Sequence, residues 1–249
     1  MTASRSPFIV FEGLDGAGST TQLERVGEWL RSHGIEVFET AEPSGSTVGR
    51  HIRSRALRSE PWPDQASWAE HMALLFAADR AEHLFGPAGS ISLALARGQW
   101  VLCDRYLLSS LAYQSTDAVP AEWVLAINRA AGRARPDVTV YVDTPVAICL
   151  DRIGHRAATS SAATPSAATA SDSEPGNRPT ESIFHERARL EAIAVRYGVF
   201  LEQPEITGHL ITVDGSQAAD EVLRCVQAGL QQWDADGSVG VPGAAGPLP

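Results

Sequence analysis

The residues with the clearest chemical potential form a glycine-rich loop near the N-terminus. Gly13 opens the segment GLDGAGSTT, which follows the apolar run Phe8–Phe11 and precedes apolar residues at helical spacing from Leu23 onward. A loop between a strand and a helix can turn its backbone N–H groups inward, and the helix N-terminus adds a positive dipole end. The segment therefore predicts a phosphate-binding loop made of Gly13, Leu14, Asp15, Gly16, Ala17, Gly18, Ser19, Thr20 and Thr21.

One position of this loop departs from the P-loop pattern G-x-x-x-x-G-K-[ST]. Gly13 and Gly18 have the required separation, and Thr20 stands where the hydroxyl that binds Mg²⁺ belongs, but Ser19 occupies the place of the lysine. The chain contains no lysine, so its 20 residues of the Lys and Arg types are all arginine. A guanidinium is a planar fork of donors, whereas an ammonium is a compact point charge. An arginine from elsewhere must therefore replace the missing charge, or activity is low.

Two other interpretations of the loop stay open on this segment alone. A dinucleotide-binding loop would use Gly16 and Gly18 with Glu39 downstream, although its third glycine is missing. In the second interpretation, the segment is a purely structural glycine-rich turn that binds no ligand. The 7 histidines have no metal-binding spacing, so we expect neither a hydrolase site nor a transition metal.

The composition is that of a globular protein, and 249 residues suffice for one domain with an elaboration. A net charge of −10 argues against a dedicated binder of nucleic acid polymers or anionic membranes. No apolar run approaches the roughly 18–20 residues that span a bilayer, and the N-terminus lacks a signal-like run, so we expect a cytoplasmic protein. The 3 cysteines lie far apart without C-x-x-C, which predicts neither a disulfide framework nor a zinc ribbon.

Short apolar runs alternate with helical patterns along the chain, which predicts an α/β fold: five parallel strands with helices on both faces. The predicted strands are 8–11, 35–38, 100–103, 138–142 and 209–213. The predicted helices run from 23 to about 33, then 47–58, 66–85, 88–97, 107–116, 121–132, 145–154, 182–200 and 217–233. We expect one domain, which carries the P-loop, over residues 1–233, interrupted by a mobile Ala/Ser/Thr-rich insertion at about 157–177. The Gly/Pro/Ala-rich tail 234–249 is predicted to be disordered.

Several further motifs follow the loop in a fixed order. They are EPSGS at 42–46 with Gly49, Ile52 and Arg53; LFAADRAEH at 75–83; DRY at 104–106 followed by SSLAYQ at 109–114; RPD at 135–137 followed by DTP at 143–145; and VDGS at 213–216. Together with FIVFEGLDGAGSTTQ, they resemble the thymidylate kinases, a family of P-loop nucleoside monophosphate kinases. The resemblance spans about residues 7–230 and implies a P-loop NTPase fold.

The resemblance implies a role for each motif in binding ATP and dTMP. Arg105 would contact the acceptor phosphate and the transferred phosphoryl group, with Arg53 as a second catalytic cation, and Asp104 would help Thr20 to hold Mg²⁺. Gly215 would lie on the adenine side. The expected acceptor site consists of Asp15, Phe76, Arg80, Arg105, Ser109, Ser110, Tyr113 and Gln114. Phe76 would stack on the base and Arg80 would bond its edge.

The family has a lid that closes over ATP and often delivers arginines. Arg152 would stack on adenine, while Arg156 and Arg178 on either side of the insertion are the expected catalytic lid arginines. For the whole protein the resemblance implies transfer of the ATP γ-phosphoryl group to dTMP by a homodimer. A kinase for another deoxynucleoside monophosphate and a weak or inactive nucleotide-binding pseudokinase remain alternatives, because Ser19 replaces the lysine.

Overall fold

The computed structural model describes residues 6–56, 64–86, 90–129, 134–162, 179–235 and 237–243. Five strands form one sheet in the order β2-β3-β1-β4-β5, and every neighbouring pair is parallel. They are β1 (Phe8–Gly13), β2 (Val37–Ala41), β3 (Trp100–Asp104), β4 (Val138–Asp143) and β5 (His209–Asp214). The predicted fold class, a five-stranded parallel α/β sheet, is therefore confirmed.

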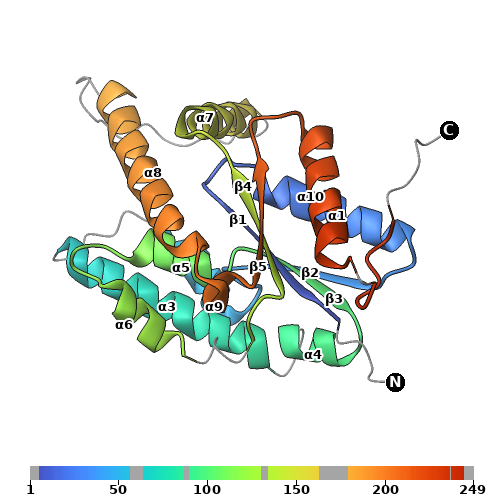
Figure 1. The fold of residues 1–249 in the computed structure, drawn as a ribbon. Coiled ribbons are helices and arrows are strands. Elements are labelled where there is room, and N and C mark those ends of the chain that lie inside the picture. Colours follow the sequence, from blue (N-terminus) through green and yellow to red (C-terminus); the bar gives the residue numbers. More distant parts are fainter. Residues whose placement is uncertain are drawn as a thin grey trace.

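Helices connect these strands and cover both faces of the sheet (Figure 1). They are α1 (Ser19–Ser32), α2 (Thr47–Ala56), α3 (Gln65–Phe85), α4 (Ile91–Ala96), α5 (Leu107–Gln114), α6 (Ala121–Ile127), α7 (Val146–Ala162), α8 (Pro179–Leu201), α9 (Pro204–Thr207) and α10 (Ala219–Trp233). Phe8 and Val10 of β1 pack in a cluster with residues of α3 and α4, while Ile9 and Phe11 pack in the cluster that includes α1 and α10. This alternation is the period-2 pattern of a strand buried on both faces.

The central strand also fixes where a ligand can bind. The chain leaves β1 toward β2 and β3 on one side of it and returns to β4 on the other, so the strand order reverses at β1. Ligands of open α/β sheets bind at such a point, beyond the carboxyl ends of the strands. Gly13 of β1 pairs with Val142 of β4, and Phe11 pairs with Asp104 of β3. The phosphate loop and the DRY turn therefore emerge side by side.

Several bounds differ from the sequence prediction, and β2 and α7 show why. Strand β2 begins at Val37 and continues to Ala41, because its register against β3 joins Val37 to Trp100 and Ala41 to Asp104. Helix α7 ends at Ala162 and not at 154, since the alanines that begin the predicted insertion are good helix formers. The short helix α9 was not predicted. Most of the insertion, and Arg178 directly after it, lie outside the described residues.

The prediction of a disordered tail is wrong for its first part. The carboxylate of Asp234 accepts backbone N–H bonds from Val239, Gly240 and Val241, each 2.8 Å long. Val239 and Val241 pack against the larger hydrophobic cluster. The glycine- and proline-rich composition of the tail gave no indication that these two valines pack against the core.

Within the described residues, no helix has both the length and the apolar character that crossing a membrane requires.

Candidate active site

The loop after β1 has the backbone of an anion cradle. Gly16 and Gly18 have positive φ angles of 86° and 103°, which side-chain-bearing residues rarely adopt. A Cβ at Gly16 would lie 2.5 Å from the carbonyl oxygen of Cys149, so only glycine fits there. Helix α1 begins at Ser19, directly after the loop, and its N-terminus adds unpaired N–H groups. The predicted loop thus has the geometry that binds phosphate oxygens.

Asp104 at the end of β3 joins this loop through two hydroxyls. Ser19 Oγ donates to its Oδ1 at 3.0 Å, and Thr20 Oγ1 donates to its Oδ2 at 2.5 Å. A hydroxyl and a carboxylate are the oxygen ligands that Mg²⁺ prefers, and two of them leave the remaining positions to water and phosphate. The residues predicted to hold Mg²⁺, Thr20 and Asp104, are therefore in contact and fit that ion.

A cavity of about 420 Å³ opens beside the loop on the side of α7 and α10. Arg152 reaches across it: Nη1 donates to the carbonyl of Ala17 at 3.0 Å, and Nη2 donates to that of Gly215 at 2.9 Å. Gln22 also lines the cavity, and its Oε1 is buried without a hydrogen-bond partner in the described structure. The predicted nucleotide residues that line the cavity are Gly16, Ala17, Gly18, Thr21, Arg152, Arg156 and Gly215.

A second cavity of about 500 Å³ lies on the other side of the loop, under α2, α3, α5 and α8. Every residue predicted for the acceptor site lines it, together with Arg53. These residues are Asp15, Phe76, Arg80, Arg105, Ser109, Ser110, Tyr113 and Gln114. With Arg53, the fold thus brings together side chains from four separate stretches of sequence.

Arg105 is the cation at the centre of this second cavity. Its Nη2 contacts Asp15 Oδ1 at 2.7 Å, its Nη1 donates to Ser109 Oγ at 3.3 Å, and its guanidinium lies 4.9 Å from the centre of the Tyr113 ring. Its φ of 69° is the one positive value on a non-glycine residue in the described chain. Such strained residues persist where the surroundings hold them and are common at active sites. Burial raises the pKa of Tyr113 to about 12, so its hydroxyl stays neutral and accepts the backbone N–H of Asp15.

Arg80 lies beneath the cavity and is almost fully bonded to protein groups. Its side chain is 1% exposed, with Nε and Nη2 donating to Glu42, Nη1 to Asn128, and Nη2 also to Ser110. The resemblance assigned Arg80 to the base edge, and at most a minority of its donors remains for that role. Gln114 lines the same cavity with a buried Oε1 that lacks a partner in the described structure. It therefore offers an acceptor for a base N–H.

Arg53 comes from α2 and lines the same cavity. Its two terminal nitrogens donate to the carbonyls of Pro43 and Ser44. These bonds fix the guanidinium and leave its charge uncompensated by acid in the contacts that the structure describes. Arg53 therefore adds positive charge where an anionic substrate would enter.

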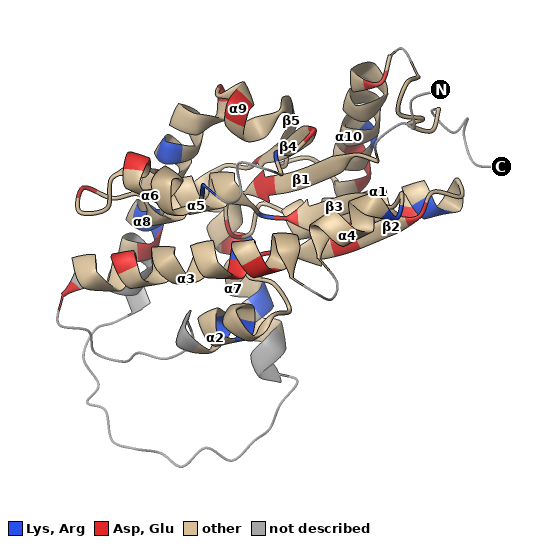
Figure 2. Ribbon diagram, turned by 90° about the horizontal axis from the view of Figure 1, so that it is seen from below, with Lys and Arg blue, Asp and Glu red and all other residues tan. Residues whose placement is uncertain are grey.

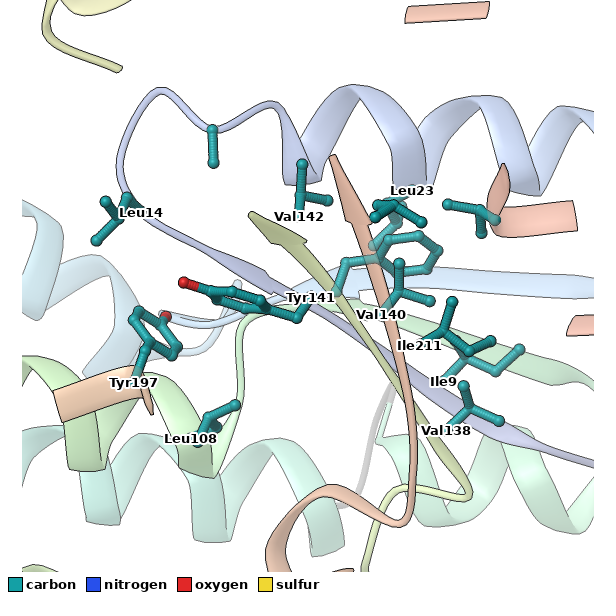
Figure 3. Close-up of a cluster of buried hydrophobic side chains, with 14 of the residues drawn as sticks. Ile9, Leu14, Leu23, Leu108, Val138, Val140, Tyr141, Val142, Tyr197 and Ile211 are labelled. Carbon is teal, nitrogen blue, oxygen red and sulfur yellow. The ribbon is translucent and has the colours of Figure 1, made fainter. Parts of the chain in front are cut away.

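The sequence analysis missed Glu12, the last acidic residue before the loop. Its Oε1 accepts the backbone N–H groups of Tyr106 and Ser109, and its Oε2 accepts the hydroxyls of Ser109 and Tyr197. Burial raises the pKa of Glu12, although these hydrogen bonds oppose the shift. Tyr197 comes from α8 and lies beside Tyr141, with ring centres 5.3 Å apart (Figure 3). A lone acid at the end of an apolar strand was the available signal.

Arg189 of α8 was also missed. It lines the acceptor cavity, and its Nη2 lies 3.4 Å from Asp15 Oδ2. No sequence signal distinguished it, because it stands among other charged residues of the same helix, such as Glu186 and Arg187.

Comparison with known proteins shows which family this chain is similar to. A model of the thymidylate kinase family matches residues 11–167. A probable thymidylate kinase of Pyrococcus abyssi is 44% identical over 142 residues, which is 57% of this chain and 67% of that protein. A thymidylate kinase of Alkalilimnicola ehrlichii is 42% identical over 155 residues, 61% of this chain and 69% of that protein.

A third relative extends the match beyond the first part of the chain. The thymidylate kinase of Desulfovibrio desulfuricans is 37% identical over 225 residues, 89% of this chain and 94% of that protein. With this agreement over most of its length, the chain belongs to the thymidylate kinase family.

Proposed function

We propose that this protein transfers the γ-phosphoryl group of Mg·ATP to dTMP, forming dTDP and ADP, through one kinase domain at residues 1–233. The observation that carries the proposal is the pair Asp104-Arg105. Asp104 bonds Ser19 and Thr20 on the donor side, and Arg105 lines the acceptor cavity. Two consecutive residues therefore join the donor loop to the acceptor cavity.

Phosphoryl transfer asks the protein mainly for alignment and for neutralisation of charge. The loop amides would hold the donor phosphates, and Thr20 with Asp104 would hold Mg²⁺, which supplies charge neutralisation when bound. The acceptor phosphate is already an anion, so no general base is needed. Arg105 and Arg53, with Arg156 and Arg178 of the lid, would provide the positive charge that Ser19 lacks.

An acceptor panel tests this function. The rate of ADP formation is measured with dTMP, dUMP, dCMP and dGMP at saturating Mg·ATP, and we expect the highest kcat/KM with dTMP. Preference for another monophosphate would make the protein a kinase of different specificity. No detectable transfer to dTMP would refute the proposal.

Ser19 favours one alternative, a pseudokinase that binds nucleotides without turnover. Calorimetry distinguishes it, because a pseudokinase binds ATP or dTMP tightly and produces no ADP in the same buffer.

We also propose a homodimer, on the strength of the family resemblance, and multi-angle light scattering measures its mass. The three cysteines are free thiols, which agrees with action in the cytoplasm.

A further inference from the structure

Arg189 places a third guanidinium beside the phosphate loop, at the mouth of the acceptor cavity. Its Nη2 lies 3.4 Å from Asp15 Oδ2, while Arg105 contacts the other oxygen, Oδ1, at 2.7 Å. The carboxylate of Asp15 thus bridges two guanidiniums. Glu186, one turn earlier on α8, accepts from Nε and Nη2 of Arg189 at 3.2 and 2.9 Å and orients the fork.

The position of Arg189 is set by a packed helix. Leu190 and Ile193 of α8 are buried in the main hydrophobic cluster. Tyr197, two turns beyond Arg189, donates to Glu12 at 2.9 Å, and Arg196 Nε donates to the carbonyl of Ala112 in α5. Helix α8 runs beside α5 (Figure 1). The guanidinium is therefore held against the loop by the core.

The charge of the cavity favours a dianion. Four arginines and two acids line it, which leaves a net charge of +2. Arg80 and Glu42 neutralise each other in a buried pair. Asp15 is then the remaining acid of the lining against three arginines, Arg53, Arg105 and Arg189. Glu186 pairs with Arg189 from outside the lining. Basic residues lie on α2 and α8, the helices that carry Arg53 and Arg189 (Figure 2).

From this geometry we infer that Arg189 binds the phosphate of the acceptor nucleotide together with Arg105. The inference rests on the proposed function. A phosphate dianion presents oxygens to two forks as the Asp15 carboxylate does, and it carries one more negative charge. Binding exchanges one oxyanion for another at both guanidiniums and leaves Asp15 to accept from a substrate hydroxyl. Arg189 thereby supplies acceptor-side charge that does not depend on closure of the lid.

The test compares dTMP with thymidine, which differ only by the phosphate group. Calorimetry measures both dissociation constants for the wild type, Arg189→Ala, Arg189→Gln and the control Arg187→Ala. Arg187 lies on the same helix and pairs with Glu191 away from the cavity. We expect each Arg189 variant to weaken dTMP binding at least about tenfold and to leave thymidine within about twofold. The control should change neither constant.

Three results would overturn the inference. They are unchanged dTMP binding in the Arg189 variants, equal losses for dTMP and thymidine, and a wild type that binds both ligands equally. The proposed function can fail while the inference holds. In that case the wild type binds dTMP more tightly than thymidine, the Arg189 variants lose this difference, and the wild type forms no ADP. The phosphate site would then be present in a protein that is not a kinase.

Discussion

Ser19 and Thr20 share the two oxygens of Asp104, so a lysine at position 19 would lose the hydroxyl bond to Oδ1 and place its ammonium beside an acid that still accepts from Thr20. The positive charge near the acceptor comes instead from Arg105, Arg53 and Arg189 around the second cavity. Removing a preorganised cation of this kind costs about 10²–10³ in kcat, whereas adding a redundant one gains little. The absence of the lysine thus goes together with positive charge on arginines around the acceptor cavity instead of on a lysine in the phosphate loop.

We therefore expect Ser19→Lys to change kcat by less than about tenfold, and Arg105→Ala to lower it about 10²–10³-fold. Steady-state kinetics with dTMP and ATP measures both. Ser19→Ala serves as the control, because it removes the hydroxyl without adding charge. A gain of several orders of magnitude in Ser19→Lys would show that the native loop is crippled.

Asp104→Asn tests the metal ligand. The amide keeps the shape but offers one oxygen acceptor in place of a carboxylate, so we expect the Mg²⁺ concentration for half-maximal activity to rise about 10–100-fold. A magnesium titration at fixed ATP measures it. Asp143→Asn, at the exposed end of β4 on the other side of β1, is the matched control. If the Mg²⁺ concentration for half-maximal activity rises equally in both variants, Asp104 is not a ligand of the metal.

Glu12 acts at the scale of elements, because its carboxylate ties β1 to the first turn of α5 and to Tyr197 of α8. Helix α5 has no side-chain cap of its own at Tyr106, so Glu12 satisfies its first N–H groups from another strand. Glu12→Gln removes the charge and one acceptor. We expect it to lower the free energy of unfolding by about 1–3 kcal/mol at pH 5, measured by urea denaturation.

The same group gives this loss a pH dependence. Burial raises the pKa of Glu12 in the folded state above the ordinary glutamate value of 4.5, so the folded state holds this proton more tightly than the unfolded state. Its contribution to stability is then full below about pH 4.5 and declines as pH rises through the raised pKa. The deficit of Glu12→Gln should shrink accordingly between pH 5 and pH 8. Glu24→Gln, on the exposed face of α1, is the control for the substitution itself.

The elements were largely predictable, and their contacts were not. Apolar runs located β1, β3 and β4, since buried parallel strands must be continuously apolar. The run HLITV located β5, although this edge strand is partly exposed. The edge strand β2 is only partly buried, so its pattern was weaker and its bounds were misplaced. Arg80 was identified, but its partners Glu42 and Asn128 lie 38 and 48 residues away in sequence. Such pairings depend on the folded arrangement, which also explains why Glu12 and Arg189 were missed.

At the scale of the whole molecule, the C-terminal segment closes onto the core after α10. Asp234 is 7% exposed and accepts three backbone N–H groups of the segment that carries Val239 and Val241. Asp234→Ala should lower the free energy of unfolding by about 1–3 kcal/mol and leave KM for dTMP unchanged, because the segment is remote from both cavities. Urea denaturation measures the loss, with the exposed Asp220→Ala as control. Unchanged stability would mean that the valines alone hold the segment.

Each of the two cavities ends in an amide oxygen that the described residues leave unsatisfied, Gln22 on one side and Gln114 on the other. An unmet buried acceptor costs about 1–3 kcal/mol, and a base that presents an N–H group removes that cost. Nucleotides would then act as conformational ligands as well as reactants, since what binds only the native state shifts the unfolding equilibrium toward it. The folded population of this protein would rise and fall with the cellular nucleotide supply.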